Sequence, residues 1–239
     1  MRSTHRHRQK ALALSMLASG LLSAAALSPC AAATTSVVKG GVVRAPVPPS
    51  LKAVESAAED LVDSALSHNR AEVVAESANL RAAGSAAAGP LTRSGIPSPQ
   101  VAQLRRRTNR VAQLARGGSF ISIALGANAV SGFMPTLYGR FHDRVPAAVL
   151  ALDYLDREAQ LRSLNRQPEK VSMAVATLVP TWARLRPRVI TAGGAKEAAA
   201  YDKHVAAMKR LLGRASKTVQ AEAVHGLNLV DRLEQVFLR

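Results

Sequence analysis

The chain has 239 residues and a formal net charge of +16 at pH 7, with 3% aromatic residues and one cysteine. A single cysteine excludes an intramolecular disulfide and a C-x-x-C-H haem attachment. The scarcity of aromatic strand formers, together with abundant alanine and leucine, favours helices over sheets.

The first 33 residues have the pattern of an export signal. Basic residues between Arg2 and Lys10 precede an uncharged run over 11–33 that is rich in leucine and alanine. The run ends in Ala31-Ala32-Ala33, small residues of the kind after which signal peptidase cleaves. We therefore expect a cleaved signal peptide over 1–33 and a periplasmic or secreted protein.

The cleavage site has an alternative. Leu27-Ser28-Pro29-Cys30 resembles the lipobox of bacterial lipoproteins, in which the cysteine is lipidated and becomes the new N-terminus. Pro29 departs from that pattern, which has Gly, Ala or Ser at this position. A lipidated Cys30 would anchor the protein to a membrane, whereas cleavage after Ala33 would release it.

A flexible tether is predicted over 34–49, which is rich in glycine, valine and proline, ahead of a single domain over 50–239. Ser50 is expected to cap a helix whose apolar residues recur every three or four positions. These residues are Leu51, Val54, Ala58, Leu61 and Ala65. A break is expected near His68-Asn69, and the glycines and prolines of 84–98 predict a loop.

A basic helix is predicted next. Ser98 and Pro99 are typical of a helix start, and apolar positions repeat at helical spacing from Val101 to Ala115. The arginines that lie off this stripe or follow it are expected to face solvent or a partner; they are Arg105, Arg106, Arg107, Arg110 and Arg116. No acidic residue occurs between Glu76 and Asp143, so the charge is positive throughout that interval.

The uncharged run over 117–139 allows three interpretations. It is long enough to span a bilayer, although Asn128, Pro135 and its many small residues disfavour insertion. The favoured interpretation is a central helix, in which Gly126 and Gly132 permit close packing. The third is a segment that rests on an anionic membrane or docks a partner.

Regular helices are predicted over the last hundred residues. One begins after Pro146, one after Pro168, one after Gly193-Gly194 and one after the Gly213–Ser216 bend. Their apolar stripes are predicted core: Ala148, Leu152, Leu155, Ala159; Val171, Val175, Leu178, Trp182, Leu185, Val189; Ala198, Tyr201, Val205, Met208, Leu212; Val219, Ala223, Val230, Leu233, Phe237. Pro180 and Pro187 predict a kink or an early end in the second of these helices. The fold class expected is all-α, an antiparallel up-and-down bundle of four to six helices.

A metal site is one hypothesis. His204 and Met208 lie four positions apart, on one helix face beside Tyr201. Imidazole and thioether ligands suit copper, and haem in a helical bundle also uses His and Met. His225 is a further candidate, in a Glu-x-x-His sequence that is half of what di-iron bundles use. The alternative is that Tyr201 and Met208 are core residues, with His204 at the rim.

Catalytic motifs are missing from the sequence: it has no G-x-S-x-G, no Walker loop and no H-E-x-x-H. The carboxylate pairs Asp60–Asp63 and Asp153–Asp156 are expected on solvated helix faces with basic neighbours. We therefore expect no enzyme and no cofactor.

The expected function is that of a non-catalytic helical-bundle protein that binds or scaffolds, in the periplasm or anchored through Cys30. One alternative is a metal- or haem-binding bundle centred on His204 and Met208. Another is a binder of anionic lipid or lipopolysaccharide through the basic helix over 101–116. Another protein of the cell envelope is also a candidate partner. Nucleic acid is not expected, because the protein is exported and has few aromatic residues to stack on bases.

Overall fold

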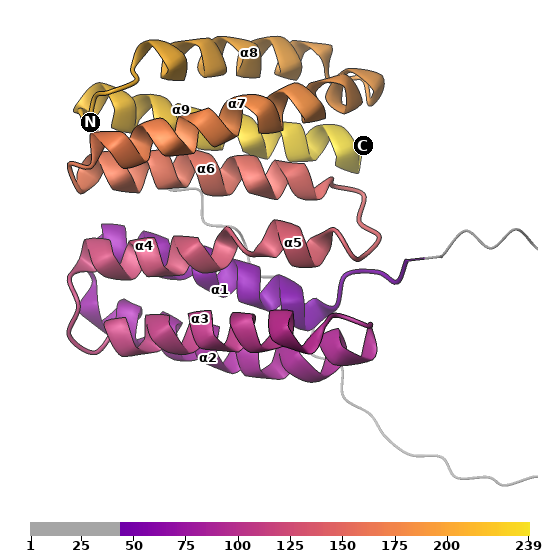
Figure 1. Ribbon diagram of the computed structural model, residues 1–239, viewed down its shortest axis with the longest axis vertical. Coiled ribbons are helices and arrows are strands. Elements are labelled where there is room, and N and C mark those ends of the chain that lie inside the picture. The colour runs from indigo at the N-terminus through magenta and orange to yellow at the C-terminus, as the bar shows by residue number, and fades with distance from the viewer. Residues whose placement is uncertain (1–43) are drawn as a thin grey trace, which may run out of the picture. The chain divides into compact units, whose positions relative to one another are not determined.

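The computed structural model describes residues 44–239, which are helical apart from the connections between helices. The helices are α1 (Pro49–Leu66), α2 (Arg70–Arg93), α3 (Ser98–Leu114), α4 (Phe120–Ser131), α5 (Met134–Tyr138), α6 (Ala147–Leu164), α7 (Pro168–Thr191), α8 (Ala195–Arg210) and α9 (Lys217–Leu238) (Figure 1). The all-α prediction is confirmed for this part of the chain. The helices outnumber the four to six expected, partly because the uncharged run forms two helices, which meet at Gly132 and Phe133.

The first hydrophobic core lies among α1 to α5. In it α1 packs against α2 and α4, and α3 packs against both α2 and α4. Leu51, Leu61, Leu80, Leu104 and Ile123 are completely buried there. Each such side chain contributes about 1.5–3 kcal/mol on leaving water, so the predicted stripes of α1 and α3 are a main source of stability.

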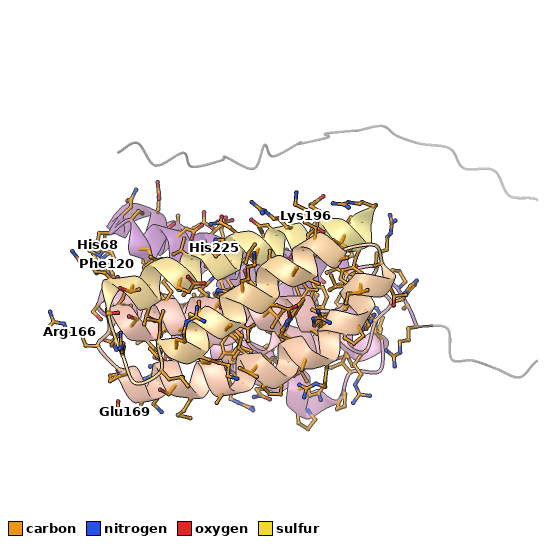
Figure 2. All side chains as sticks on the ribbon, turned by 90° about the horizontal axis from the view of Figure 1, so that it is seen from above. His68, Phe120, Arg166, Glu169, Lys196 and His225 are labelled. Carbon is orange, nitrogen blue, oxygen red and sulfur yellow. The ribbon has the colours of Figure 1, made fainter. Side chains whose placement is uncertain are left out.

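The connection between α1 and α2 matches the predicted break. Asn69 caps α2 by accepting a hydrogen bond from the backbone N–H of Glu72. His68 has a φ of 58°, and its ring stacks on that of Phe120 with 4.8 Å between centroids (Figure 2). The guanidinium of Arg70 lies over the same Phe120 ring and donates to the carbonyl oxygens of Ala115 and Gly118. These contacts join the start of α2 to the connection that precedes α4.

The helix α4 of the uncharged run lies between α1 and α3 on one side and α6 on the other. α4 packs against α1, α3 and α6, as the central-helix interpretation requires. Phe120–Tyr138 would be long and apolar enough to span a bilayer by length and composition, with a mean hydropathy of 1.4, and half of its window is buried. A Cβ atom at Gly132 would lie 2.6 Å from the ring of Tyr154, so this glycine permits the predicted close approach, here between α4 and α6.

The second half consists of α6 to α9, which lie side by side in Figure 1. Here α6 packs against α7 and α9, and α8 packs against the same two helices. The predicted stripe of α7 is buried throughout, from Val171 to Val189. The stripe of α8 is buried as far as Met208, whereas Leu212, beyond the helix end, is 44% exposed. Because α6 also contacts α4 and α5, it joins the two halves.

The loop predicted over 84–98 is wrong for most of its length, because α2 continues to Arg93. Gly84 is buried inside α2, where a Cβ atom would lie 2.6 Å from Oγ1 of Thr108 on α3. The glycine thus serves helix packing and does not mark a turn. The connection to α3 is confined to residues 94–97, where Gly95 has a φ of +76°.

Prolines do not end the helices that contain them. Pro90 lies inside α2, and Pro180 and Pro187 lie inside α7, which continues to Thr191. A proline leaves unpaired the carbonyl four residues earlier. At all three sites that carbonyl belongs to an exposed residue, which water can reach: Ala86, Ala176 and Ala183. Of the kink or early end expected for α7, the early end is therefore wrong.

The last residues of the predicted tether lie against the helices. The Arg44 guanidinium donates to the carbonyl of Gly139 at 3.0 Å, and the N–H of His142 donates to the carbonyl of Ala45 at 2.8 Å. Val47 is buried in the first core. The flexible tether predicted over 34–49 is thus wrong for residues 44–49, and α1 begins at Pro49 instead of after a Ser50 cap.

Candidate functional site

A buried polar cluster joins α6, α8 and α9. The Nε2 atom of His204 lies 2.8 Å from Oδ1 of Asp156, and its Nδ1 atom lies 2.8 Å from Oε1 of Glu222. The side chains of His204 and Asp156 have no solvent exposure, and that of Glu222 is 24% exposed. We call Asp156, Tyr201, His204 and Glu222 the histidine cluster.

Tyr201 and Gly226 complete the surroundings of Asp156. The Tyr201 hydroxyl donates to Oδ2 of Asp156 at 2.7 Å, so both oxygens of this carboxylate have hydrogen-bond partners. A Cβ atom on Gly226 would lie 2.5 Å from Oδ2 of Asp156 and 2.5 Å from Nε2 of His204. Only glycine at this position of α9 lets the helix lie against the cluster without displacing it.

The electrostatics favour a protonated His204. Burial opposes the charged imidazole, but the hydrogen bonds and charges of Asp156 and Glu222 outweigh it and raise the pKa of His204 above its usual value. With a proton on each ring nitrogen, His204 can donate to both carboxylates. Burial raises the pKa of Asp156, while the hydrogen bonds from His204 and Tyr201 act in the opposite direction. The pKa of Tyr201 is raised by burial and by the Asp156 charge.

These contacts limit what the cluster can do chemically. An Asp–His pair serves hydrolysis when the second ring nitrogen faces a nucleophile. In this cluster the second nitrogen faces the carboxylate of Glu222 instead. The arrangement is that of a buried ion-pair network that links α6, α8 and α9.

The predicted metal ligands do not converge. Met208 is buried in a small apolar cluster with Val171 and Val219. His225 is exposed on α9 (Figure 2), and its ring centroid lies 6.3 Å from that of His204. Within residues 44–239, no group of three or more His, Cys, Asp or Glu side chains is arranged to hold a metal ion. Metal binding at His204, Met208 and His225 stays a prediction, to which this geometry adds no support.

The position of Asp156 corrects an expectation, because this residue was placed on a solvated face. It lies four residues after Leu152 and three before Ala159, which are both on the buried stripe of α6. That spacing is a signal for burial that could have been recognised in the sequence. Glu222 was noted only for its spacing to His225, whereas its partner in the structure is His204 on α8.

The predicted anion-binding arginines separate into two groups. Arg105, Arg106, Arg110 and Arg116 are exposed, as expected. Arg107 is half-buried: its Nη1 atom donates to the carbonyl oxygen of Ala129 at 2.8 Å, and its guanidinium lies 5.2 Å from the ring centroid of Phe133. Arg107 was expected to face solvent or a partner, but it joins α3 to α4 and is only partly exposed.

Exposed arginines remain on α2, on α3 and just after α3. The two helices pack against each other and lie at the edge of the described unit opposite α8 (Figure 1). Arg81 and Arg93 of α2 are exposed, like Arg105, Arg106 and Arg110 of α3. We define the basic face as Arg81, Arg93, Arg105, Arg106, Arg110 and Arg116. The predicted lipidation site, Cys30, lies outside the described residues.

No family model, no curated protein and no solved structure matches this chain. Functional inference therefore rests on the residues themselves.

Proposed function

We propose that this protein is an exported, non-catalytic helical protein that binds an anionic membrane surface through the basic face. In this proposal residues 50–239 act as a single antiparallel up-and-down bundle domain behind the signal over 1–33. The observation that carries the proposal is the exposure of the six arginines of the basic face, which lie in an interval from Glu76 to Asp143 that has no acidic residue between its ends.

The physical argument is electrostatic. Each basic residue held near an anionic bilayer surface contributes about 1 kcal/mol, and the effect falls off within a Debye length. The exposed positions of α2 include Ala75, Ala78, Ala82 and Ala86, and Val74 is its one exposed large apolar side chain. Large apolar and aromatic side chains are what anchor a helix within the headgroup region. The proposed binding is therefore peripheral and sensitive to salt.

The proposal of export rests on the N-terminal sequence pattern. Export determines which membrane surface the protein can contact. Mass spectrometry of the mature N-terminus tests this part of the proposal. We expect a chain that begins at Thr34, and a lipidated Cys30 at the N-terminus would identify an anchored protein on the same surface. An intact Met1 on protein recovered from the cytosol would contradict export.

The binding test uses sedimentation with vesicles of phosphatidylglycerol and phosphatidylcholine, compared with phosphatidylcholine alone. The variant Arg105→Glu/Arg106→Glu/Arg110→Glu reverses three charges of the basic face. Its affinity for the anionic vesicles should fall at least about 100-fold, since each lost arginine accounts for about 1 kcal/mol. Raising the salt from about 50 to about 500 mM should also release the unmodified protein.

The matched control reverses three exposed cations on α8, at the opposite edge of the unit: Lys203→Glu/Lys209→Glu/Arg210→Glu. This variant has the same net charge as the α3 variant, so a simple dependence on total charge would weaken both equally. The proposal requires the α3 variant to lose at least about 10-fold more affinity than the control. Equal losses of vesicle affinity in the two variants, or binding that does not depend on salt, would exclude the basic face as the binding surface.

A further inference from the structure

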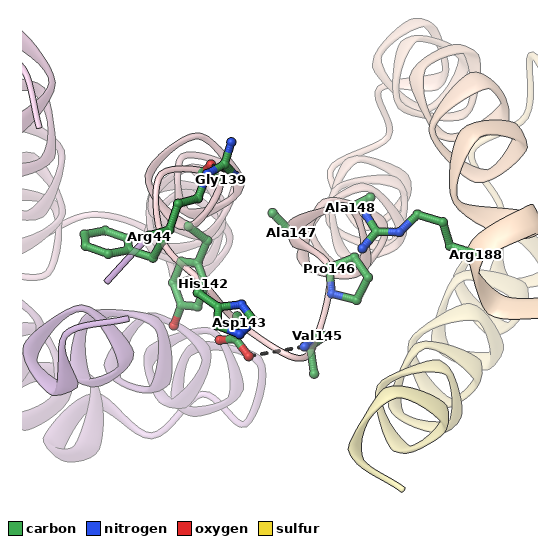
Figure 3. A pocket seen from close by; sticks show the side chains of 11 residues that line it. Arg44, Gly139, His142, Asp143, Val145, Pro146, Ala147, Ala148 and Arg188 are labelled. Atoms are coloured by element: carbon green, nitrogen blue, oxygen red, sulfur yellow. Dashed lines mark hydrogen bonds between the residues drawn. The ribbon is translucent and has the colours of Figure 1, made fainter. Parts of the chain in front are cut away.

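A cavity of about 580 Å³ lies where residues 44–48 meet the connection between α5 and α6. Its polar lining consists of Arg44, Tyr138, His142, Asp143 and Arg188, and Figure 3 labels all of these except Tyr138. Its apolar wall includes Ala147 and Ala148, at the start of α6. The volume lies within the range of about 300–1,000 Å³ that is typical of small-molecule sites. None of these residues belongs to the basic face.

Two guanidinium groups line this cavity from separate elements. Arg44 precedes α1 and is held in place by its hydrogen bond to the carbonyl of Gly139. Arg188 comes from the last turn of α7 and extends toward Pro146 and Ala148 (Figure 3). Arg188 is exposed on α7. Its five donors are therefore available to a ligand.

The charge balance of the lining is positive. Asp143 is the one carboxylate in the lining, and its Oδ1 accepts a hydrogen bond from the backbone N–H of Val145 at 3.2 Å. Against it stand the two arginines, with His142 as a further donor. The first amides of α6 also have no partner within the helix, and they add to the positive potential at the apolar wall.

We infer that this cavity binds a small organic oxyanion, with a phosphate or carboxylate group held by Arg44 and Arg188 and a compact apolar body against Ala147 and Ala148. Guanidinium groups present paired N–H donors that match the oxygens of either anion. The apolar wall distinguishes such a ligand from an inorganic ion, which would leave that surface uncovered. This site goes beyond the proposed surface binding, and it can exist without it.

Isothermal titration of the purified protein tests the inference with four probes: phenyl phosphate, benzoate, inorganic phosphate and benzyl alcohol. Phenyl phosphate or benzoate should bind at least about 10-fold more tightly than inorganic phosphate or benzyl alcohol, since only these two offer both an anion and an apolar ring. Whichever of the two binds more tightly identifies the anionic group that the site prefers.

The variants Arg188→Gln and Arg44→Gln each remove one guanidinium. Each should weaken binding of the preferred probe about 10- to 100-fold, the usual effect of losing a charge-assisted hydrogen bond. The control is Arg184→Gln, which changes an exposed arginine one turn earlier on α7, outside the cavity lining. Its affinity should stay within about twofold of the unmodified protein. Circular dichroism and a thermal melt establish that each variant is folded.

The inference is overturned by any of three results: no organic anion binds to the folded protein, benzyl alcohol binds as tightly as the anions, or neither Arg188→Gln nor Arg44→Gln weakens binding. Sedimentation of Arg188→Gln with anionic vesicles separates this site from the basic face. That variant should bind vesicles as the unmodified protein does. A failure of the cavity proposal can therefore be distinguished from a failure of the proposed membrane binding.

Discussion

His204 Nε2 lies 2.8 Å from Asp156 Oδ1, although the two residues are 48 positions apart in the chain and on different helices. Both side chains are completely buried, and the other ring nitrogen of His204 contacts Glu222. A contact of this kind makes the stability of the fold depend on protonation, because the imidazole carries its full attraction to the carboxylates only when it is charged.

The free energy of unfolding should fall as the pH rises above about 6.5, the usual pKa of histidine in an unfolded chain. The pKa of His204 is raised in the folded state, so its contribution is complete below that pH and is lost as the pH passes through the folded value. The raised pKa of Asp156 acts with the same sign, starting from about pH 4. Urea unfolding at a series of pH values measures the effect.

Histidine variants provide the control for this pH dependence. His204→Gln should remove most of the fall above about pH 6.5 and cost about 3–5 kcal/mol near neutral pH, because it leaves the Asp156 carboxylate buried without its cation. His225→Gln changes an exposed neighbour and should keep the pH dependence. A stability that stays level or rises between about pH 6.5 and 8.5 in the unmodified protein would contradict a charged His204.

Gly226→Ala should destabilise the protein by about 1–3 kcal/mol, because the added methyl would lie 2.5 Å from atoms of both Asp156 and His204. Alanine is the better helix former, so a gain of about 1 kcal/mol would be expected if only propensity mattered. Chemical unfolding compares this variant with Gly117→Ala, where the added Cβ meets open space. A Gly226→Ala protein as stable as the Gly117→Ala control would mean that α9 does not approach the cluster this closely.

The adjacent residues Arg106 and Arg107 of α3 should differ in their effects on stability and on vesicle binding. Arg107→Gln should lower the free energy of unfolding by about 1.5–3 kcal/mol, since it removes a charged hydrogen bond to the carbonyl of Ala129 and the contact with Phe133. Arg106→Gln should change stability by less than about 0.5 kcal/mol and weaken binding to anionic vesicles. Thermal melts and vesicle sedimentation on both variants give the comparison. If Arg106→Gln were the destabilising substitution and Arg107→Gln the one that weakens vesicle binding, Arg107 would lie on the surface.

The chain's one tryptophan reports on the packing of α7 against α8. The indole N–H of Trp182 donates to Oδ1 of Asp202 at 2.8 Å, and Nε of Arg186 donates to Oδ2 at 2.9 Å. Asp202→Ala should change the Trp182 emission and cost about 1–2 kcal/mol, while Asp202→Asn, which keeps an acceptor oxygen, should cost less. Fluorescence-detected unfolding measures both. Equal effects of the two substitutions would show that the indole hydrogen bond contributes little.

Helical periodicity predicted the fold class and most of the core. The stripes from Leu51 to Ala65 and from Val171 to Val189 are buried as expected, and the break at His68-Asn69 is where the pattern placed it. Local sequence was sufficient for these features, because each apolar stripe requires burial whatever its partner is. The i,i+4 ion pairs Asp153–Arg157 and Glu158–Arg162 follow from the same local geometry.

Features that depend on which helices meet could not be predicted from periodicity. Gly84 was interpreted as a loop residue, but its role is to admit Thr108 from α3. Arg107 lies off the apolar stripe of its own helix, but α4 supplies a carbonyl and an aromatic ring within its reach. In both cases the deciding atom belongs to another helix.

By itself, the sequence determined that the chain would form helices with apolar stripes, where most of those helices would lie, and that positive charge would dominate between Glu76 and Asp143. Tertiary structure alone decided that Asp156, His204 and Glu222 meet, that Arg107 leaves the basic face, and that Arg44 and Arg188 line one cavity. The reason is that a stripe specifies which face of a helix is buried, whereas the pairing of charges depends on the rotation and register of several helices at once.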